Sequence, residues 1–358
     1  MKLEDRIALI KQVGEEIISE EDLKKLLETK KNPVAYDGFE PSSKIHIAQG
    51  LMRAINTNKM TKAGCSFKMF VADWHAWANN KLGGNLDNIQ TAGKYMIEVW
   101  KACGMDLKNV KFIWASELVK DEEYWKKVMN VSRDLTLARA LRTTQIMGRS
   151  EKETLSAAQI LYPCMQAADI FHLEADITQL GMDQRKVNML AREVGPKLGF
   201  WKPVVVSHHM LMGLGQPPAA DLPVEERAMA MKMSKSKPET AIFMTDSQED
   251  VQRKISKAYC PERLIIGNPI MEYMKYIVFE KFPTIKIERP SKFGGNLEVD
   301  GFSSLTGIYE NGELHPTDLK NTCAKYINEM LEPVRKHFEK DKKARDLKKQ
   351  VDSFEITR

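Results

Sequence analysis

Residues 33–39 read Pro-Val-Ala-Tyr-Asp-Gly-Phe, and residues 41–50 read Pro-Ser-Ser-Lys-Ile-His-Ile-Ala-Gln-Gly. The first segment is short and strand-like, and the second opens a helix-patterned stretch that begins near His46 and ends at Gly64. Three further strand-like segments follow, again separated by helix-patterned stretches, at 67–73, 110–116 and 203–207. This alternation is typical of parallel βαβ units, and it predicts an α/β domain with a doubly wound, Rossmann-like parallel sheet.

The chain of 358 residues is long enough for about two domains. A mostly helical insert at about 117–180 separates the third and fourth strand-like segments, and helical patterns dominate beyond about residue 240. We therefore expect a catalytic domain at 1–240 and an all-α domain at 241–358.

The composition limits the class of protein. The chain carries 54 Lys and Arg against 49 Asp and Glu, and 43% of its residues are hydrophobic. These values exclude a chain that is disordered throughout, and the net charge of +5 suits a local basic face for nucleic acid. The five cysteines form no zinc-type cluster, which favours free thiols and predicts no metal site. Because no signal peptide and no apolar run of ~18 residues is evident, we expect a cytoplasmic protein without a membrane span.

Two motifs have the chemistry to hold a nucleotide. After the first strand, His46 and Gln49 supply side-chain donors near the start of the expected helix, where free N–H groups favour anions. After the last strand, Lys232-Met233-Ser234-Lys235-Ser236 places two lysines where they can close over a polyphosphate and stabilise the charge of departing pyrophosphate. Taken singly, the first motif is better explained as a capped helix, and a solvated basic loop would explain the second equally well.

A third motif has the pattern of a polar pocket. Tyr162, Gln166 and Asp169 recur at i, i+4 and i+7, so they share one face of the expected helix, and most of the residues around them are apolar. A polar cluster within an apolar wall indicates a binding pocket. A phenol, an amide and a carboxylate can bind a substrate with an ammonium at one end and a hydroxyl at the other, and tyrosine is such a substrate.

The order of the two nucleotide motifs resembles that of the class I aminoacyl-tRNA synthetases, whose "HIGH" and "KMSKS" signatures occupy these places. The second motif matches letter for letter, whereas the first reads His46-Ile47-Ala48-Gln49, with a methyl in place of glycine and an amide in place of the second histidine. Over nearly the whole chain the sequence is similar to the archaeal and eukaryotic tyrosyl-tRNA synthetases, with matching segments at 35–42, 72–76, 181–186 and 257–261.

This resemblance implies an enzyme that activates L-tyrosine with ATP, which brings Mg²⁺, and transfers the tyrosyl group to tRNA(Tyr). It also implies a homodimer whose interface is built by the insert. The implied catalytic residues are His46, Gln49, Lys232 and Lys235. The ATP site would comprise these four together with Gly38, Ala48, Met233, Ser234 and Ser236.

The resemblance assigns the remaining substrates as well. Tyr36 and Asp169 would hold the phenol of the substrate, and its α-ammonium would be held by Tyr162, Gln166 and Gln184. In the C-terminal region Phe293 and His315 would sandwich an unstacked anticodon guanine whose base edge donates to Asp318. Arg185 is a weaker candidate for contact with the tRNA.

Three alternatives remain open at this point. Tryptophanyl-tRNA synthetases share the architecture, but the Tyr36 and Asp169 pair argues against them. A non-catalytic RNA-binding relative is disfavoured by the intact Lys232–Ser236 motif, and a general nucleotidyltransferase by the Phe293, His315 and Asp318 set.

Overall fold

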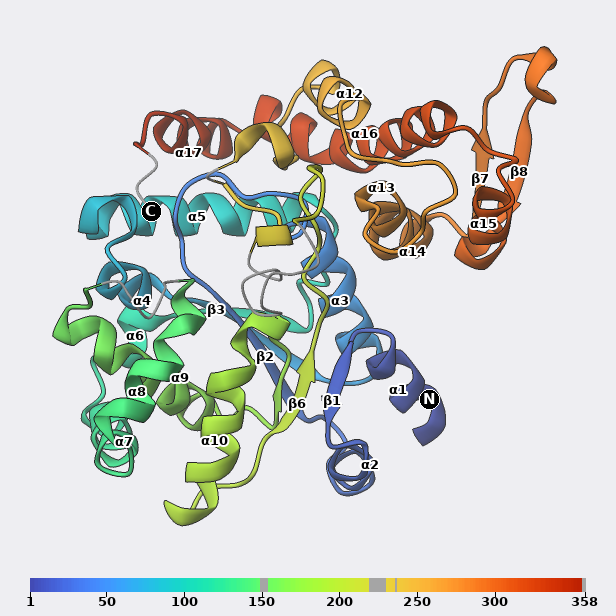
Figure 1. The fold of residues 1–358 in the computed structure, drawn as a ribbon. Helices are drawn as coiled ribbons and strands as arrows, with labels where there is room; N and C mark the ends of the chain where they lie inside the picture. The colour runs from blue at the N-terminus through green and yellow to red at the C-terminus, as the bar shows by residue number, and fades with distance from the viewer. Residues whose placement is uncertain (149–153, 219–229, 236, 356–358) are drawn as a thin grey trace.

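The computed structural model describes residues 1–148, 154–218, 230–235 and 237–355. Its centre is a six-stranded sheet in the order β1-β6-β5-β2-β3-β4 (Figure 1). Five strands are parallel, and the edge strand β1 runs antiparallel to β6. Their bounds are β1 Glu16–Ile18, β2 Val34–Phe39, β3 Ser66–Val71, β4 Val110–Trp114, β5 Ile177–Thr178 and β6 Val204–Ser207.

The sheet confirms the doubly wound α/β fold. The four expected strands are β2, β3, β4 and β6. The chain places β3 and then β4 on one side of β2, and it then places β5 and β6 on the other side of β2. β1 and β5 were not predicted, because three and two residues are too few to display a period.

Helices surround the sheet. The helices that precede the insert are α1 Leu3–Lys11, α2 Glu20–Thr29, α3 Leu51–Lys62, α4 Asp73–Ala78, the 3₁₀ turn Lys81–Gly84 and α5 Leu86–Ala102. The insert contains α6 Ala115–Leu118, α7 Glu122–Arg133, α8 Leu137–Thr143, the 3₁₀ turn Thr144–Met147 and α9 Ala157–His172. After β5 come the 3₁₀ turn Met182–Gln184 and α10 Arg185–Lys197.

The helix expected to begin near His46 begins instead at Leu51, so that expectation was wrong by about one turn. Residues 45–47 pair with the segment 242–244, through Ile47 N–H to Ile242 O at 2.9 Å and Met244 N–H to Ile45 O at 3.0 Å. These long-range hydrogen bonds hold the backbone extended where the local pattern favours helix. Gly50 then precedes α3 at a close approach, since an added Cβ would lie 2.2 Å from the Met244 sulfur.

The C-terminal region is mainly helical, as expected, and lies above α5 in Figure 1. Its elements are the 3₁₀ turn Pro238–Thr240, α12 Gln248–Ser256, α13 Pro269–Tyr273, the π turn Met274–Val278, α14 Phe279–Lys281, β7 Thr284–Ile287, the 3₁₀ turn Ser291–Phe293, β8 Leu297–Asp300, α15 Gly301–Glu310, α16 Pro316–Lys340 and α17 Lys342–Asp352. The description all-α was wrong in one detail, because β7 and β8 form an antiparallel hairpin. Its strands bury only alternate side chains over four residues each, too short a pattern to predict from sequence.

Two apolar clusters form the interior. The larger continues from the sheet, α3 and α5 into α12, α16 and α17, and His337 Nε2 on α16 lies 3.0 Å from Glu98 Oε2 on α5. The smaller surrounds α7, α9 and α10. Among the helices within the described ranges, none is long and apolar enough to cross a membrane.

Candidate active site

The predicted substrate-binding residues meet between β2 and β5. At this point the order in which strands are added to the sheet reverses. Tyr36 on β2 pairs with Thr178 on β5, and the carboxyl end of β2 continues into Asp37 and Gly38. In open α/β sheets this switch point is where ligands bind. Helix α9 crosses the same region and carries the polar face that the sequence analysis singled out.

One end of the polar cluster is a fully enclosed carboxylate. Asp169 is 1% exposed; Tyr124 Oη donates to its Oδ1 at 3.0 Å, and His75 Nε2 lies 2.9 Å from its Oδ2. Burial lowers the pKa of His75, but the charge and hydrogen bond of Asp169 outweigh this effect and raise the pKa above its usual value. Burial, with the nearby charge of Asp169, raises the pKa of Tyr36 well above its usual range, so its phenol keeps its proton.

The other end of the cluster brings together three predicted side chains. Gln166 Nε2 donates to Gln184 Oε1 at 3.1 Å, and Tyr162 Oη donates to Glu40 Oε1 at 2.7 Å. Asn79 Nδ2 also donates to the Glu40 carboxylate, at 3.0 Å. The side-chain oxygen of Gln166 is buried and has no hydrogen-bond partner among the described residues, which leaves an acceptor available for a cation.

The two nucleotide motifs, separated by almost two hundred positions, touch in the fold. Lys235 Nζ donates to Ser42 Oγ at 3.0 Å, and Lys232 Nζ forms an ion pair with Asp183 Oδ2 at 3.1 Å. Burial lowers the pKa of Lys235 to about 7. Burial and the positive charges of Lys235, Arg53 and Lys232 hold the pKa of His46 well below its usual range, so His46 is a neutral hydrogen-bonding group. Several basic groups thus converge on one side of the polar cluster.

The other predicted nucleotide residues lie on the same segments. Gly38 belongs to β2, while Ala48 and Gln49 form the turn that leads into α3, where Gln49 Oε1 is buried without a partner among the described residues. Met233 is buried, and its N–H donates to Leu211 O at 2.9 Å; Ser234 is next to it in the chain. Ser236 lies outside the described residues.

A second charged pair near this side was not predicted. Asp37 Oδ2 lies 3.1 Å from Arg53 Nη1, and the same Arg53 nitrogen lies 2.7 Å from His208 Nδ1. Burial raises the pKa of Asp37 to about 7, although Arg53 opposes the shift. Arg53 and His208 come from α3 and the end of β6, so only the fold brings them to the end of β2.

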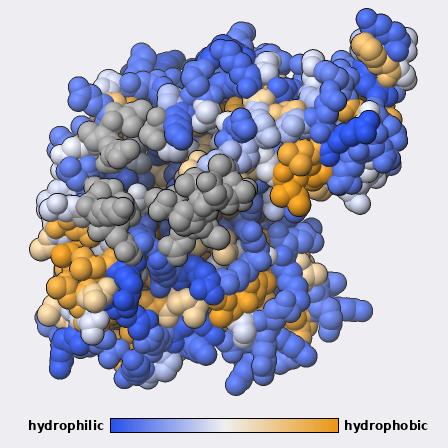
Figure 2. Space-filling view, in the orientation of Figure 1, coloured by the Kyte–Doolittle hydropathy of each residue, from blue (hydrophilic) through white to orange (hydrophobic). Residues whose placement is uncertain are grey.

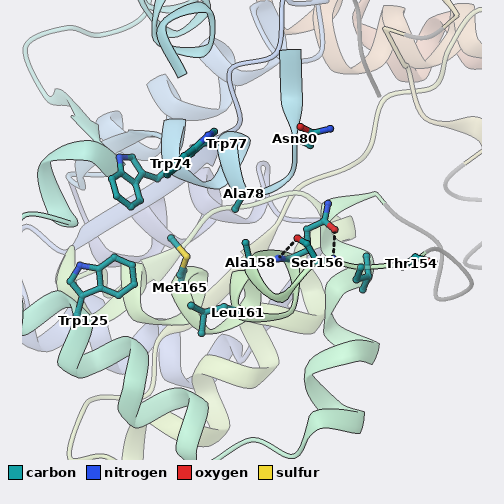
Figure 3. Close-up of a pocket in the computed structure, with 12 residues that line it drawn as sticks. Trp74, Trp77, Ala78, Asn80, Trp125, Thr154, Ser156, Ala158, Leu161 and Met165 are labelled. Carbon is teal, nitrogen blue, oxygen red and sulfur yellow. Dashed lines mark hydrogen bonds between the residues drawn. The ribbon is translucent and has the colours of Figure 1, made fainter. Parts of the chain in front are cut away.

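A separate cavity of about 760 Å³ lies beside α9 (Figure 3). Three indoles, Leu161 and Met165 give it an apolar wall, with Trp74 and Trp125 rings 6.4 Å apart. The dashed bonds in Figure 3 are the capping box that begins α9, in which Ser156 and Gln159 each accept a backbone N–H from the other. None of the predicted tyrosine-binding residues lines this cavity, so it is distinct from the polar cluster.

Three of the predicted RNA-binding residues belong to the 3₁₀ turn Ser291–Phe293 and to the start of α16, in the part of the chain that holds the projecting β7–β8 hairpin (Figure 1). Phe293 is 59% exposed, and the ammonium of Lys292 lies 4.9 Å from its ring. His315 precedes α16 and accepts from Thr317 N–H at 3.1 Å, while Asp318 lies in the first turn of α16. Arg289 Nη1 donates to Glu313 O at 2.8 Å, which ties the hairpin loop to the approach of α16.

Arg185, the weaker RNA candidate, is on the opposite region of the chain at the start of α10. Its guanidinium forms an ion pair with Glu16 on β1 at 2.8 Å. The structure therefore places Arg185 near the sheet edge and away from Phe293, His315 and Asp318.

Comparison with known proteins identifies the family. A family model described as "tRNA synthetases class I (W and Y)" matches residues 28–332. The "Tyrosine--tRNA ligase 1, cytoplasmic" of Arabidopsis thaliana is 51% identical over 100% of this chain and 90% of its own length. The chain belongs to the tyrosyl-tRNA synthetases. Another relative, the "Tyrosine--tRNA ligase" of Thermococcus kodakarensis, is 41% identical over 98% of this synthetase and 99% of its own length.

A solved structure agrees with this assignment. The tyrosyl-tRNA synthetase of Pyrococcus horikoshii, crystallised with L-tyrosine, superimposes on this synthetase with a TM-score of 0.90 at 40% identity. The match covers 98% of this synthetase and 100% of the Pyrococcus chain. The fold, the family and the resemblance stated from the sequence are thereby confirmed.

Proposed function

We propose how the described residues of this synthetase divide the work of its reaction. The chain is a tyrosine–tRNA ligase: it activates L-tyrosine with ATP to tyrosyl-adenylate and transfers the tyrosyl group to the 3′ end of tRNA(Tyr). The carboxylate of tyrosine attacks the α-phosphorus of ATP, the bond from that phosphorus to the bridging oxygen of pyrophosphate breaks, and pyrophosphate leaves. A carboxylate is already ionised at neutral pH, so this step needs positioning and charge stabilisation and no general base.

The tyrosine pocket extends from Asp169 to Glu40. Tyr36 donates a hydrogen bond to the phenol oxygen of the substrate, and Asp169 accepts one from the phenol hydroxyl; Tyr162, Gln166 and Gln184 surround the α-ammonium. The contacts of Asp169 support this assignment, because Tyr124 and His75 fix both carboxylate oxygens in place. Phenylalanine would leave buried polar groups unpaired, which costs about 1–3 kcal/mol per group. Tyrosyl-tRNA synthetases are the general example of such rejection, which needs no editing site.

The nucleotide side uses His46, Gln49, Lys232 and Lys235. The ammonium groups of the two lysines stabilise the charge that develops on pyrophosphate, while neutral His46 and the amide of Gln49 donate to phosphate oxygens. Gly38, Ala48, Met233, Ser234 and Ser236 complete the ATP site along the same segments. Mg²⁺ enters as part of the substrate Mg-ATP; within the described ranges no three His, Cys, Asp or Glu side chains gather as a metal site.

The C-terminal region reads the tRNA. Phe293 and His315 stack on an anticodon guanine and Asp318 accepts from its edge, an assignment supported by the exposure of Phe293 and by the Arg289 link between the two loops. Arg185 contacts the tRNA nearer the sheet once its pairing with Glu16 is exchanged for a phosphate.

The active form is a cytoplasmic homodimer joined through the insert. Exposed large apolar side chains of the insert support this surface: Leu137 is 64% and Met129 55% exposed, and Leu141 is also exposed. Figure 2 shows apolar side chains gathered over this part of the molecule, at the left of the view. Such patches are typical of interfaces.

The single observation that carries the proposal is the adjacency of the enclosed Asp169 pocket and the joined nucleotide motifs at one switch point. The test is ATP–pyrophosphate exchange measured with tyrosine and, side by side, with tryptophan. We expect exchange with tyrosine only, and its loss in Asp169→Ala. Exchange that persists in Asp169→Ala would remove the proposed phenol site, and exchange with tryptophan would contradict the proposed specificity.

A further inference from the structure

The strand that carries Lys232 is held by the C-terminal region. Residues 211–213 run antiparallel to residues 231–233, through Gly213 N–H to Met231 O and Met233 N–H to Leu211 O, both at 2.9 Å. Met212 lies directly opposite Lys232. In this register the pair does not hydrogen-bond to itself, so the N–H and C=O of Met212 point away from Lys232.

Helix α13 satisfies both outward groups of Met212. Met212 N–H donates to Glu272 Oε2 at 3.0 Å, and Tyr273 Oη donates to Met212 O at 3.0 Å. Tyr273 is completely buried. Glu272 and Tyr273 therefore supply the hydrogen bonds that a neighbouring strand would otherwise make to Met212, the residue opposite Lys232.

Glu272 is itself fixed in orientation. His209 Nε2 lies 3.0 Å from Glu272 Oε2, and His209 Nδ1 lies 3.1 Å from Glu15 Oε2. The imidazole stacks on Tyr276 with ring centroids 4.3 Å apart. The carboxylate that receives Met212 N–H is thus anchored to the segment before β1, to the end of β6 and to α13.

We propose that Glu272 and Tyr273 are positioning residues for adenylate formation: they act through Met212 to set the position of Lys232 beside the polyphosphate of ATP. This inference rests on the proposed role of Lys232. Neither side chain needs to touch a substrate. Their effect is to fix the backbone on which the lysine stands, and a shift of that backbone reduces transition-state stabilisation.

The test compares Tyr273→Phe with Tyr309→Phe. Tyr309 is a matched control because it is also completely buried in the C-terminal region, and its hydroxyl donates to a backbone carbonyl, Pro261 O, at 2.8 Å. We expect Tyr273→Phe to slow single-turnover adenylate formation about three- to tenfold, the equivalent of one hydrogen bond, with the dissociation constant of tyrosine unchanged. We expect Tyr309→Phe and Tyr273→Phe to lower the melting temperature by similar amounts. Tyr309→Phe should leave the rate of adenylate formation unaffected.

A second pair of variants tests Glu272 without altering a buried ring. Glu272→Ala removes the acceptor of Met212 N–H, whereas the amide oxygen of Glu272→Gln retains it. We expect Glu272→Ala to slow adenylate formation and Glu272→Gln to recover most of the loss.

Equal rates for Tyr273→Phe and Tyr309→Phe would overturn the proposal, as would equal losses in Glu272→Ala and Glu272→Gln. Lys232→Ala is measured in parallel. If Lys232→Ala slows the step and Tyr273→Phe does not, only the positioning role is overturned. If Lys232→Ala has no effect, the proposed role of the lysine fails as well.

Discussion

His75 Nε2 lies 2.9 Å from Asp169 Oδ2, and both side chains are 1% exposed. Tyr124 engages the other carboxylate oxygen. An isolated buried carboxylate would be costly, and these two donors offset the cost of burying Asp169. The selectivity of the pocket therefore depends on residues that do not touch the substrate in our proposal.

Tyr124→Phe removes one of these donors and keeps the ring. We expect the KM for tyrosine to rise about three- to tenfold, because a hydrogen bond of roughly 1 kcal/mol is lost, while the KM for ATP stays constant. Tyr95→Phe is the control, since the buried Tyr95 hydroxyl bonds Thr245 outside the pocket. A parallel rise in both KM values would contradict a role confined to tyrosine binding.

Lys232→Ala should slow adenylate formation about 10²- to 10³-fold, the range seen when one transition-state donor is removed, and should alter tyrosine binding far less. Pre-steady-state ATP–pyrophosphate exchange and equilibrium tyrosine binding separate the two effects. The exposed neighbour Lys237 offers a control, Lys237→Ala, of the same charge change. Equal effects on both measurements would refute the proposed role.

Lys235 should make kcat/KM for ATP depend on pH. Its pKa of about 7 means that the ammonium loses its proton in the free enzyme as the pH rises through that value. We expect kcat/KM for ATP to fall across this range, because a neutral amine no longer attracts phosphate. Lys235→Arg should abolish the fall, since a guanidinium stays charged. An unchanged profile in the arginine variant would show that another group titrates.

His209 should make stability depend on pH. Burial lowers the pKa of His209, but hydrogen bonds and charges from Glu15 and Glu272 raise it from 6.5 to about 9. Lys275, in the π turn that follows α13, is a further charge that acts on Glu15. A raised folded-state pKa gives a stabilisation that is complete below about 6.5 and is lost as the pH rises through about 9. Urea unfolding should show this loss in the wild type and not in His209→Gln. If the free energy of unfolding changed with pH equally in both proteins, His209 would not link Glu15 and Glu272 in the way described.

Gly50→Ala should lower the free energy of unfolding by about 1–3 kcal/mol, the usual cost of overpacking. The added methyl meets the side chain of Met244, on the segment that pairs with residues 45–47. In a double-mutant cycle, combining Gly50→Ala with Met244→Ala should cost less than the sum of the two single changes, because the smaller side chain relieves the clash. Strict additivity would place the strain elsewhere.

Local patterns were enough to predict β2, β3, β4 and β6 and the shared helix face of Tyr162, Gln166 and Asp169. The enclosing residues Tyr124, His75 and Glu40 could not be predicted, since they come from α7, α4 and the end of β2 and meet α9 only through the fold. His75 lay within a segment already matched to the family, at 72–76, which is the one signal that could have singled it out. Likewise, nothing in the pair His208-His209 indicated that Glu15 and Glu272 would converge on the second histidine.

Helix α13 hydrogen-bonds to Met212, so the part of the chain before residue 240 depends on contacts from the C-terminal region. A chain truncated near residue 240 would keep every proposed tyrosine and ATP ligand, yet the N–H and C=O of Met212 would lose both of their side-chain partners. Such a fragment would also lose residues 242–244, which pair with residues 45–47, and the helices that complete the larger apolar cluster. The C-terminal region, which carries the proposed RNA-binding residues, thus also supports the backbone beside Lys232.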